Sequence, residues 1–235
     1  MEMKKLVFLT GAGISAESGI TTFRDSGGLW EQYKVEDVAT IDGYRRNPEL
    51  VLNFYNERRK QLLSVKPNAA HKGVVELEKY FDTVVITQNV DNLHETAGSL
   101  HVMHLHGELS KVCSTDNPND SRYIREIPLD QDVKIGDKAG DGSQLRPFIV
   151  WFGEPVPQME AAVSYVQQAD IFVVIGTSLN VYPAASLLYY VPESAQVFLI
   201  DPKPVDTHSL RPIRVIQKGA SEGVKELTQI LLEQK

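Results

Sequence analysis

The chain has 235 residues, a hydrophobic content of 42% and a formal net charge of −7, which suits one globular core or a core with an inserted lobe. The acidic balance argues against tight binding of nucleic acid through a basic face, although it leaves basic protein partners open. No apolar run approaches the ~20 residues needed to span a membrane, and the first predicted strand is not preceded by the apolar region of a signal peptide, so we expect a cytoplasmic protein without a membrane partner.

Apolar, β-branched runs recur along the chain and predict the strands of a parallel sheet. They occupy residues 6–9, 84–86, 147–151, 171–175 and 197–200, and helix-like segments separate several of them. Amphipathic patterns at 161–169 and 222–232 predict helices that pack on this sheet. The alternation predicts an α/β fold with a Rossmann-like parallel sheet and helices on both faces.

Two stretches depart from this alternation of strands and helices. Residues 25–70 are mostly helical in pattern, with Asn47 and Pro48 as the cap and first turn of a helix. Residues 108–146 are polar and irregular. A loop of that length inside a compact domain is usually functional or a small subdomain.

The first predicted strand leads into a glycine-rich segment, residues 11–20, followed by Phe23, Arg24 and Asp25. Glycines let the backbone pass close to a ligand, and the free N–H groups at a helix start favour phosphate oxygens. A Gly-x-Gly pattern after a strand is weak evidence by itself. The polar and charged residues that follow are not needed by a packing turn, so the longer segment favours a nucleotide site.

Two further polar segments lie later in the chain. Residues 87–94 (Thr-Gln-Asn-Val-Asp-Asn-Leu-His) come directly after the run 83–86, and residues 103–107 read Met-His-Leu-His-Gly. In open parallel sheets, ligands lie beyond the carboxyl ends of the strands, so we expect residues 87–94 to face the same crevice as the glycine-rich segment. Taken alone, Asn89 and Asp91 could instead be loop caps.

These three segments resemble a known family, as do Leu145-Arg146-Pro147, residues 150–154 and residues 176–184. Together they closely resemble the sirtuins, the NAD-dependent protein lysine deacylases, over nearly the whole chain and in the family's order. The resemblance implies one catalytic domain over residues 1–235, with a large NAD-binding lobe at approximately 1–24, 71–107 and 147–235. The small lobe would comprise approximately 25–70 and 108–146, and the substrate cleft would lie between the lobes.

The resemblance also implies the reaction. NAD is the cofactor, the acyl oxygen of an acyl-lysine protein attacks the ribose carbon, and nicotinamide and O-acyl-ADP-ribose are released. His106 matches the catalytic histidine, whose unperturbed pKa of ~6.5 suits a general base near neutral pH. His104 points to the other side of an extended segment, so we expect it to be structural. The remaining catalytic matches are Asn89 and Asp91, which hold nicotinamide and ribose, and Arg24 near the pyrophosphate and leaving group.

The binding residues of the family carry over position by position. The matches to NAD-binding positions are Gly11, Ala12, Gly13, Ser15, Ala16, Glu17, Phe23, Arg24, Trp30, Gln88, Asn89, Val90, Asp91, His106, Gly176, Thr177, Ser178, Asp201, Pro202, Lys203 and Ala220. The matches to substrate-binding positions are Val150, Phe152, Gly153, Glu154, Asn180 and Val181. In the family an acyl-peptide lies between the segments that match residues 150–154 and 179–182, and it would add itself there by main-chain hydrogen bonds.

One predicted helix narrows the expected acyl group. At about 100° per residue, Arg58 falls within the apolar stripe of the helix that starts at Pro48. A guanidinium on the core side is costly unless it meets an anion. Tyr55 and Arg58 match the pair that binds the carboxylate of succinyl- or malonyl-lysine in some sirtuins, and Ala39 matches a small residue that leaves room for it. The alternative is that Arg58 meets a structural carboxylate.

Two departures from the family pattern bear on the expected chemistry. Most sirtuins carry two Cys-x-x-Cys pairs that bind zinc, whereas Cys113 is the single cysteine here, which excludes a thiolate zinc site and an intramolecular disulfide. We therefore expect no metal and a small lobe held by packing. Thr21 stands where the family usually has proline.

Two alternatives to the deacylase stay open at this stage. One is an NAD glycohydrolase or ADP-ribosyltransferase built on the same fold, and the other is a non-catalytic NAD-sensing module. The sequence predicts neither the protein targets nor the oligomeric state.

Overall fold

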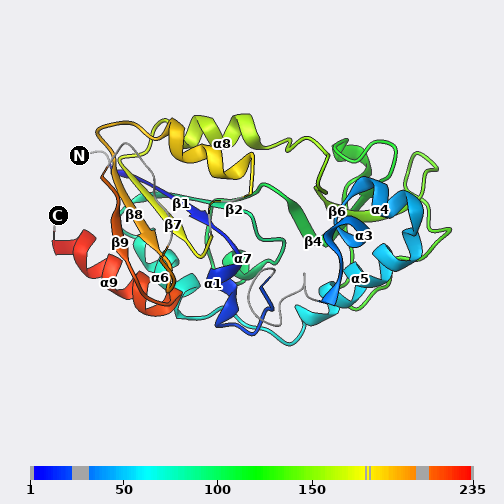
Figure 1. Ribbon diagram of the computed structural model, residues 1–235, viewed down its shortest axis with the longest axis horizontal. Helices are drawn as coiled ribbons and strands as arrows, with labels where there is room; N and C mark the ends of the chain where they lie inside the picture. The colour runs from blue at the N-terminus through cyan, green and yellow to red at the C-terminus, as the bar shows by residue number, and fades with distance from the viewer. Residues whose placement is uncertain (1–2, 23–31, 178, 180, 205–211, 234–235) are drawn as a thin grey trace.

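The structure is a computed structural model that describes residues 3–22, 32–177, 179, 181–204 and 212–233 (Figure 1). Its larger sheet has six strands in the order β3-β2-β1-β7-β8-β9, and every neighbouring pair is parallel. The strands are β1 Lys5–Thr10, β2 Asp82–Thr87, β3 Val102–His104, β7 Ile171–Ile175, β8 Gln196–Ile200 and β9 Arg214–Ile216. The predicted α/β fold with a Rossmann-like sheet is confirmed.

Helices cover both faces of this sheet because its strands are apolar on both sides. Leu6 and Phe8 of β1 pack in one core cluster with α6 (Ala69–Leu77) and α9 (Ala220–Glu233). Val7 and Leu9 point the other way and pack with α8 (Met159–Val166) and the 3-10 helix η2 (Ala184–Tyr190). Figure 1 shows α8 on one side of the sheet and α6 with α9 on the other.

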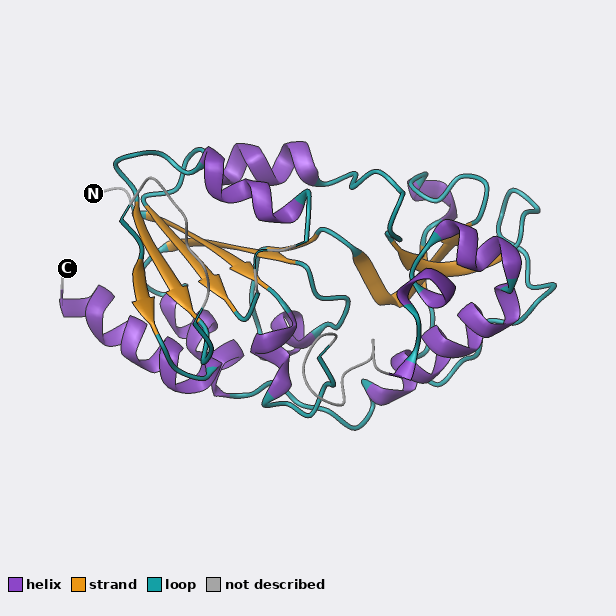
Figure 2. Cartoon of the chain, in the orientation of Figure 1, coloured by secondary structure: helices purple, strands orange, loops and turns teal. Residues whose placement is uncertain are grey.

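A second, antiparallel sheet of three strands lies at the other end of the molecule (Figure 2). Its order is β5-β4-β6, with β4 Gly107–Ser114, β5 Arg125–Glu126 and β6 Leu145–Ile149. The helices around it are α3 Val35–Val38, α4 Ile41–Arg46, α5 Pro48–Gln61 and the 3-10 helix η1 Ser121–Tyr123. The Asn47 side chain accepts the backbone N–H of Leu50, so the predicted start of α5 is confirmed.

Two predictions about this second sheet are wrong. The run 147–151 was expected in the parallel sheet, yet β6 pairs antiparallel with β4. An apolar run reports burial but does not specify its partner strand, which explains this error. Residues 108–146 were expected to be irregular, but β4 extends to Ser114 with a register shift between Glu108 and Val112. This irregularity interrupts the alternation that would have marked the strand.

Hydrogen bonds supplement the packing that was expected to hold this region. The buried Ser114 Oγ donates to Asp141 Oδ2 at 2.6 Å and accepts the N–H of Asn117 at 2.8 Å. Asp141 Oδ2 also accepts from Asn117 Nδ2 at 2.9 Å, and Asp141 Oδ1 accepts from Ser143 Oγ at 2.8 Å. This Ser114–Asp141 cluster joins the loop after β4 to the loop before β6. The predicted lobe boundaries stay a prediction.

The neighbour of Arg58 on α5 forms a second polar connection. Arg59 is fully buried, and its guanidinium donates to the carbonyls of Leu109 at 2.8 Å and Gln131 at 2.9 Å. It thereby ties α5 to β4 and to the loop that follows β5. Among the helices of the described ranges, none has the length and apolar character needed to cross a bilayer.

Candidate active site

A cavity of about 620 Å³ extends from the carboxyl ends of β1, β2 and β7 to α5 and the β6 end of the second sheet. The predicted binding residues converge on it, as the position beyond the strand ends requires. Every predicted binding residue that the structure describes lines this cavity, except Ser15 and Asp91. The cavity thus brings together segments that are far apart in the sequence.

Glycines make the wall of the cavity at the ends of β1 and β7. Gly11 N–H donates to the carbonyl of Ile175 at 3.0 Å, and Gly13 N–H donates to the carbonyl of Gly176 at 2.9 Å. A Cβ on Gly13 would lie 2.6 Å from the Gly176 Cα, and Gly176 itself has a φ of +61°. The two loops can therefore come this close only because both positions are glycine, and backbone atoms form this part of the cavity wall.

Asn89 is held by residues that lie behind the cavity wall. Its Nδ2 donates to the Gly11 carbonyl and to Ser15 Oγ, both at 3.1 Å. Ser15 Oγ in turn donates to Asp91 Oδ2 at 3.0 Å, and Asp91 Oδ1 accepts the N–H of Leu93 at 3.1 Å. Burial raises the pKa of Asp91 in spite of these hydrogen bonds. In this geometry Ser15 and Asp91 position Asn89.

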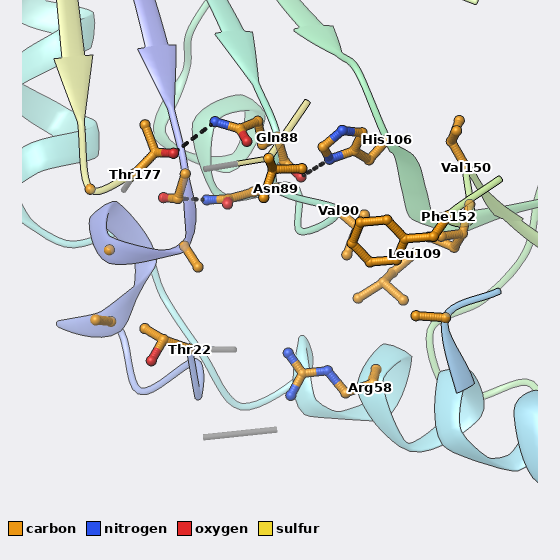
Figure 3. A pocket seen from close by; sticks show the side chains of 18 of the residues that line it. Thr22, Arg58, Gln88, Asn89, Val90, His106, Leu109, Val150, Phe152 and Thr177 are labelled. Atoms are coloured by element: carbon orange, nitrogen blue, oxygen red, sulfur yellow. Dashed lines mark hydrogen bonds between the residues drawn. The ribbon is translucent and has the colours of Figure 1, made fainter. Parts of the chain in front are cut away.

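His106 lies where β3 leads into β4 and faces the cavity (Figure 3). Its Nδ1 is 3.1 Å from the carbonyl oxygen of Gln88, which can only accept, so Nδ1 carries the proton. Nε2 is therefore left with its lone pair. Burial lowers the pKa of His106, and the Gln88 hydrogen bond opposes this only in part. The imidazole is therefore neutral near pH 7 and can accept a proton.

His104 has a different role, in line with its expected structural position. Its Nδ1 donates to the Asn89 carbonyl at 2.9 Å, and its Nε2 lies 2.7 Å from Glu95 Oε1. Burial disfavours the charged ring, but the hydrogen bond and charge of Glu95 prevail and raise the pKa of His104. His104 thus fixes the backbone of the segment that carries Asn89.

The far end of the cavity is lined by α5 and by the residues after β6. Figure 3 shows Arg58 extending from α5 into the open space, across from His106 and Asn89. No hydrogen bond or ion pair joins the Arg58 guanidinium to any residue in the described ranges. Burial lowers the pKa of Arg58, while Tyr55 and Asp91 counteract this, and an arginine remains charged at neutral pH. Tyr55 lies beside it and is 6% exposed.

Residues 11–183, which make up most of the chain, match the Sir2 family. The chain belongs to the Sir2 family. A NAD-dependent protein deacylase of Bacteroides thetaiotaomicron is 69% identical over 231 residues, covering 98% of this chain and 99% of the relative. A NAD-dependent protein deacylase of Helicobacter pylori is 50% identical with the same coverage. A solved complex of a Sir2 homologue with NAD has a TM-score of 0.85 at 38% identity, covering 99% of this chain and 91% of that one.

The last helix contributes to the other end of the Sir2 cavity. Glu17 Oε1 accepts the N–H of Ser221 at 3.0 Å, so the glycine-rich segment caps the start of α9. Asp201 Oδ1 accepts the N–H of Lys203 at 2.9 Å after β8. Ala220 and Pro202 complete this side of the cavity.

Five predicted Sir2 site residues lie outside the described residues: Phe23, Arg24, Trp30, Ser178 and Asn180. Other cavity residues were not predicted, among them Phe54, Leu109 and Trp151. Leu109 belongs to the unpredicted part of β4, and the sequence pattern places Phe54 only in the apolar stripe of its helix. Trp151 stands inside a matched segment, and its large aromatic ring was the available signal.

Proposed function

We propose that succinyl- and malonyl-lysine in proteins are the preferred substrates of this chain, which is an NAD-dependent protein deacylase of the Sir2 family. The observation that carries the proposal is the Arg58 guanidinium, which lines the cavity without a partner in the described ranges. A partly buried cation that has no direct ion pair is costly, so the cavity favours a ligand with an anion at this position.

The residues around the cavity fit NAD. The backbone wall formed by Gly11, Gly13 and Gly176 leaves space for a pyrophosphate, and the amides of Gln88 and Asn89 lie on the same side. When bound, NAD supplies the ribose carbon that receives the acyl group as nicotinamide leaves. With NAD bound, His106 Nε2 would accept a proton from a ribose hydroxyl, and the Gln88 carbonyl keeps the ring in the tautomer that this requires.

The residues near α5 fit the acyl-lysine side chain. Ala39, whose small side chain leaves room for the acyl chain, accepts the N–H of Phe152 at 2.9 Å through its carbonyl. An acyl chain that runs past Ala39 toward α5 would bring its distal carboxylate to Arg58 and Tyr55. An acetyl group ends before that point and carries no charge. The Arg58 contact therefore favours succinyl- and malonyl-lysine over acetyl-lysine.

The test is a comparison of one peptide in its succinyl, malonyl and acetyl forms, with NAD saturating and nicotinamide release followed over time. We expect kcat/KM to be at least about tenfold higher for the acidic acyl groups. Equal values for all three peptides would contradict the proposed specificity. A reaction without peptide is the control: equally fast nicotinamide release would indicate a glycohydrolase, and no release in any reaction would indicate a sensing module.

A further inference from the structure

We propose that Trp151 is a specificity-determining positioning residue, which directs the Tyr55 hydroxyl so that it donates into the acyl end of the cavity. The proposal rests on the acidic-acyl specificity argued above and assigns a source to part of it. Trp151 is 2% exposed and lies two residues after the end of β6, while Tyr55 lies on α5, 96 residues earlier. The two side chains meet beneath the cavity that they both line.

The direction of one hydrogen bond carries the inference. The Trp151 indole Nε1 lies 3.1 Å from the Tyr55 hydroxyl oxygen. An indole N–H can only donate, so the Tyr55 oxygen is the acceptor and its own hydrogen must point elsewhere. Among the residues that the structure describes, Trp151 is the one hydrogen-bond partner of Tyr55. The hydroxyl hydrogen is thus left for a ligand in the cavity.

Burial keeps the Tyr55 hydroxyl protonated. Burial raises the pKa of Tyr55. The Trp151 hydrogen bond and the charges of Arg146 and Arg58 lower it, but their effect is smaller than that of burial. The hydroxyl therefore stays protonated at neutral pH. A donor that also accepts a hydrogen bond is polarised and donates more strongly. Tyr55 is thereby suited to an anionic acceptor, and it stands beside the Arg58 cation.

The Trp151 ring is itself fixed from two sides. The Arg146 guanidinium lies 4.2 Å from the ring centroid, and the Tyr44 ring lies 4.9 Å away at an interplanar angle of 33°. The buried Arg146 forms an ion pair with the partly buried Glu154 at 2.9 Å, and Glu154 Oε2 also accepts the Trp151 backbone N–H at 2.9 Å. These contacts hold both the ring and the backbone of Trp151 and favour the ring orientation in which the indole N–H points to Tyr55.

A succinyl or malonyl carboxylate would then meet two fixed donors, the Arg58 guanidinium and the Tyr55 hydroxyl. Acetyl-lysine has no oxygen at that position to accept the hydroxyl hydrogen. The contribution of Trp151 should consequently appear in the discrimination between acyl groups, and only through Tyr55.

The experiment is a double-mutant cycle of Trp151→Phe and Tyr55→Phe, with kcat and KM measured on succinyl- and acetyl-lysine forms of one peptide. We expect Trp151→Phe to lower the succinyl-to-acetyl ratio of kcat/KM by roughly three- to tenfold, through KM for the succinyl peptide. In the Tyr55→Phe background the same substitution should leave the ratio unchanged. The proposal would be overturned if Trp151→Phe left the ratio unchanged in the protein that keeps Tyr55. It would also be overturned if Trp151→Phe lowered the ratio equally with and without the Tyr55 hydroxyl.

A second replacement covers the case in which phenylalanine disturbs the fold. Benzothienylalanine at position 151, introduced by suppression of a stop codon, replaces the indole N–H by sulfur and keeps the shape of the ring. It should lower the ratio as Trp151→Phe does, and an unchanged ratio would overturn the proposal. Arg58→Met, measured in parallel, distinguishes a failure of the proposed acyl specificity from a failure of the proposed role of Trp151. If Arg58→Met and Tyr55→Phe leave the ratio unchanged, the acyl specificity itself is wrong; if they lower it while Trp151→Phe does not, only the role of Trp151 is wrong.

Discussion

Replacing Arg58 by methionine tests the proposed acyl specificity most directly. The substitution removes the guanidinium but keeps an unbranched aliphatic side chain on α5, a helix that is well packed through its other face. Succinyl- and malonyl-lysine then lose a charged hydrogen-bond donor, whereas acetyl-lysine has no group that used it. The loss should therefore fall on the acidic acyl groups.

The magnitude follows from the position of Arg58. A fully exposed ion pair contributes about 0–1 kcal/mol, and a hydrogen bond to a charged group in a more buried place about 1.5–3 kcal/mol. Arg58 is partly buried in a cavity wall, so we take about 2 kcal/mol. This corresponds to roughly a 30-fold rise in KM for the succinyl peptide. Acetyl-lysine should lose far less.

The assay measures kcat and KM for succinyl- and acetyl-lysine forms of one peptide at saturating NAD. Arg45→Met is the matched control, because Arg45 is an exposed arginine on α4 whose ion pair with Asp42 is also exposed. The control should resemble the unmodified protein on both peptides. Equal losses on both peptides in Arg58→Met would mean that Arg58 supports the fold, and the reasoning from its unpaired charge would be wrong.

Three further predictions concern the base, the Ser114–Asp141 cluster and zinc. His106→Ala should lower kcat at least about 100-fold while calorimetry still detects NAD binding. In the unsubstituted protein, the acid limb of the pH–rate profile should lie below pH ~6.5, because burial lowers the pKa of His106. Asp141→Ala should lower the thermal midpoint at pH 7. Hydrogen bonds from Ser114 and Asn117 hold the pKa of Asp141 below its usual value. The difference in thermal midpoint between the variant and the unsubstituted protein should therefore be present above pH ~4 and shrink as the pH falls further. Metal analysis of purified, untagged protein should find far less than one zinc per chain, and chelators should leave the thermal midpoint unchanged; about one zinc per chain would contradict this.

The parts of the fold that could be predicted are those encoded in short, continuous segments. β7 was predicted at its observed bounds, and α5 begins at the cap and proline that marked it, because apolar runs and helix starts are local signals. The cavity could be located for the same reason, since each polar segment directly follows its strand. β4 was missed because an irregularity breaks its alternation, and the short edge strand β9 has two exposed residues out of three.

Contacts between distant segments could not be predicted from these patterns. Arg58 was expected within the apolar stripe of its helix, yet Arg59 is the fully buried arginine, because β4 and the loop at Gln131 cover that side of α5. The hydrogen bond between Tyr55 and Trp151 and the cluster at Asp141 likewise depend on how two loops meet. Such pairings are fixed by tertiary packing, for which a single sequence carries no periodic signal.

The position of β1 in the middle of the parallel sheet has a consequence for the order of folding. On one side β1 pairs with β2, but on the other it pairs with β7, and the contact between Lys5 and Asp170 closes a loop of 165 residues. During synthesis β1, β2 and β3 leave the ribosome first, and the free edge of β1 stays unpaired until β7 has emerged. An apolar strand edge is a template for association, so the nascent chain is most prone to aggregation in this interval. The hydrogen bond between Glu17 of the glycine-rich segment and Ser221 forms later still, because it spans 204 residues and requires that α9 has been synthesised.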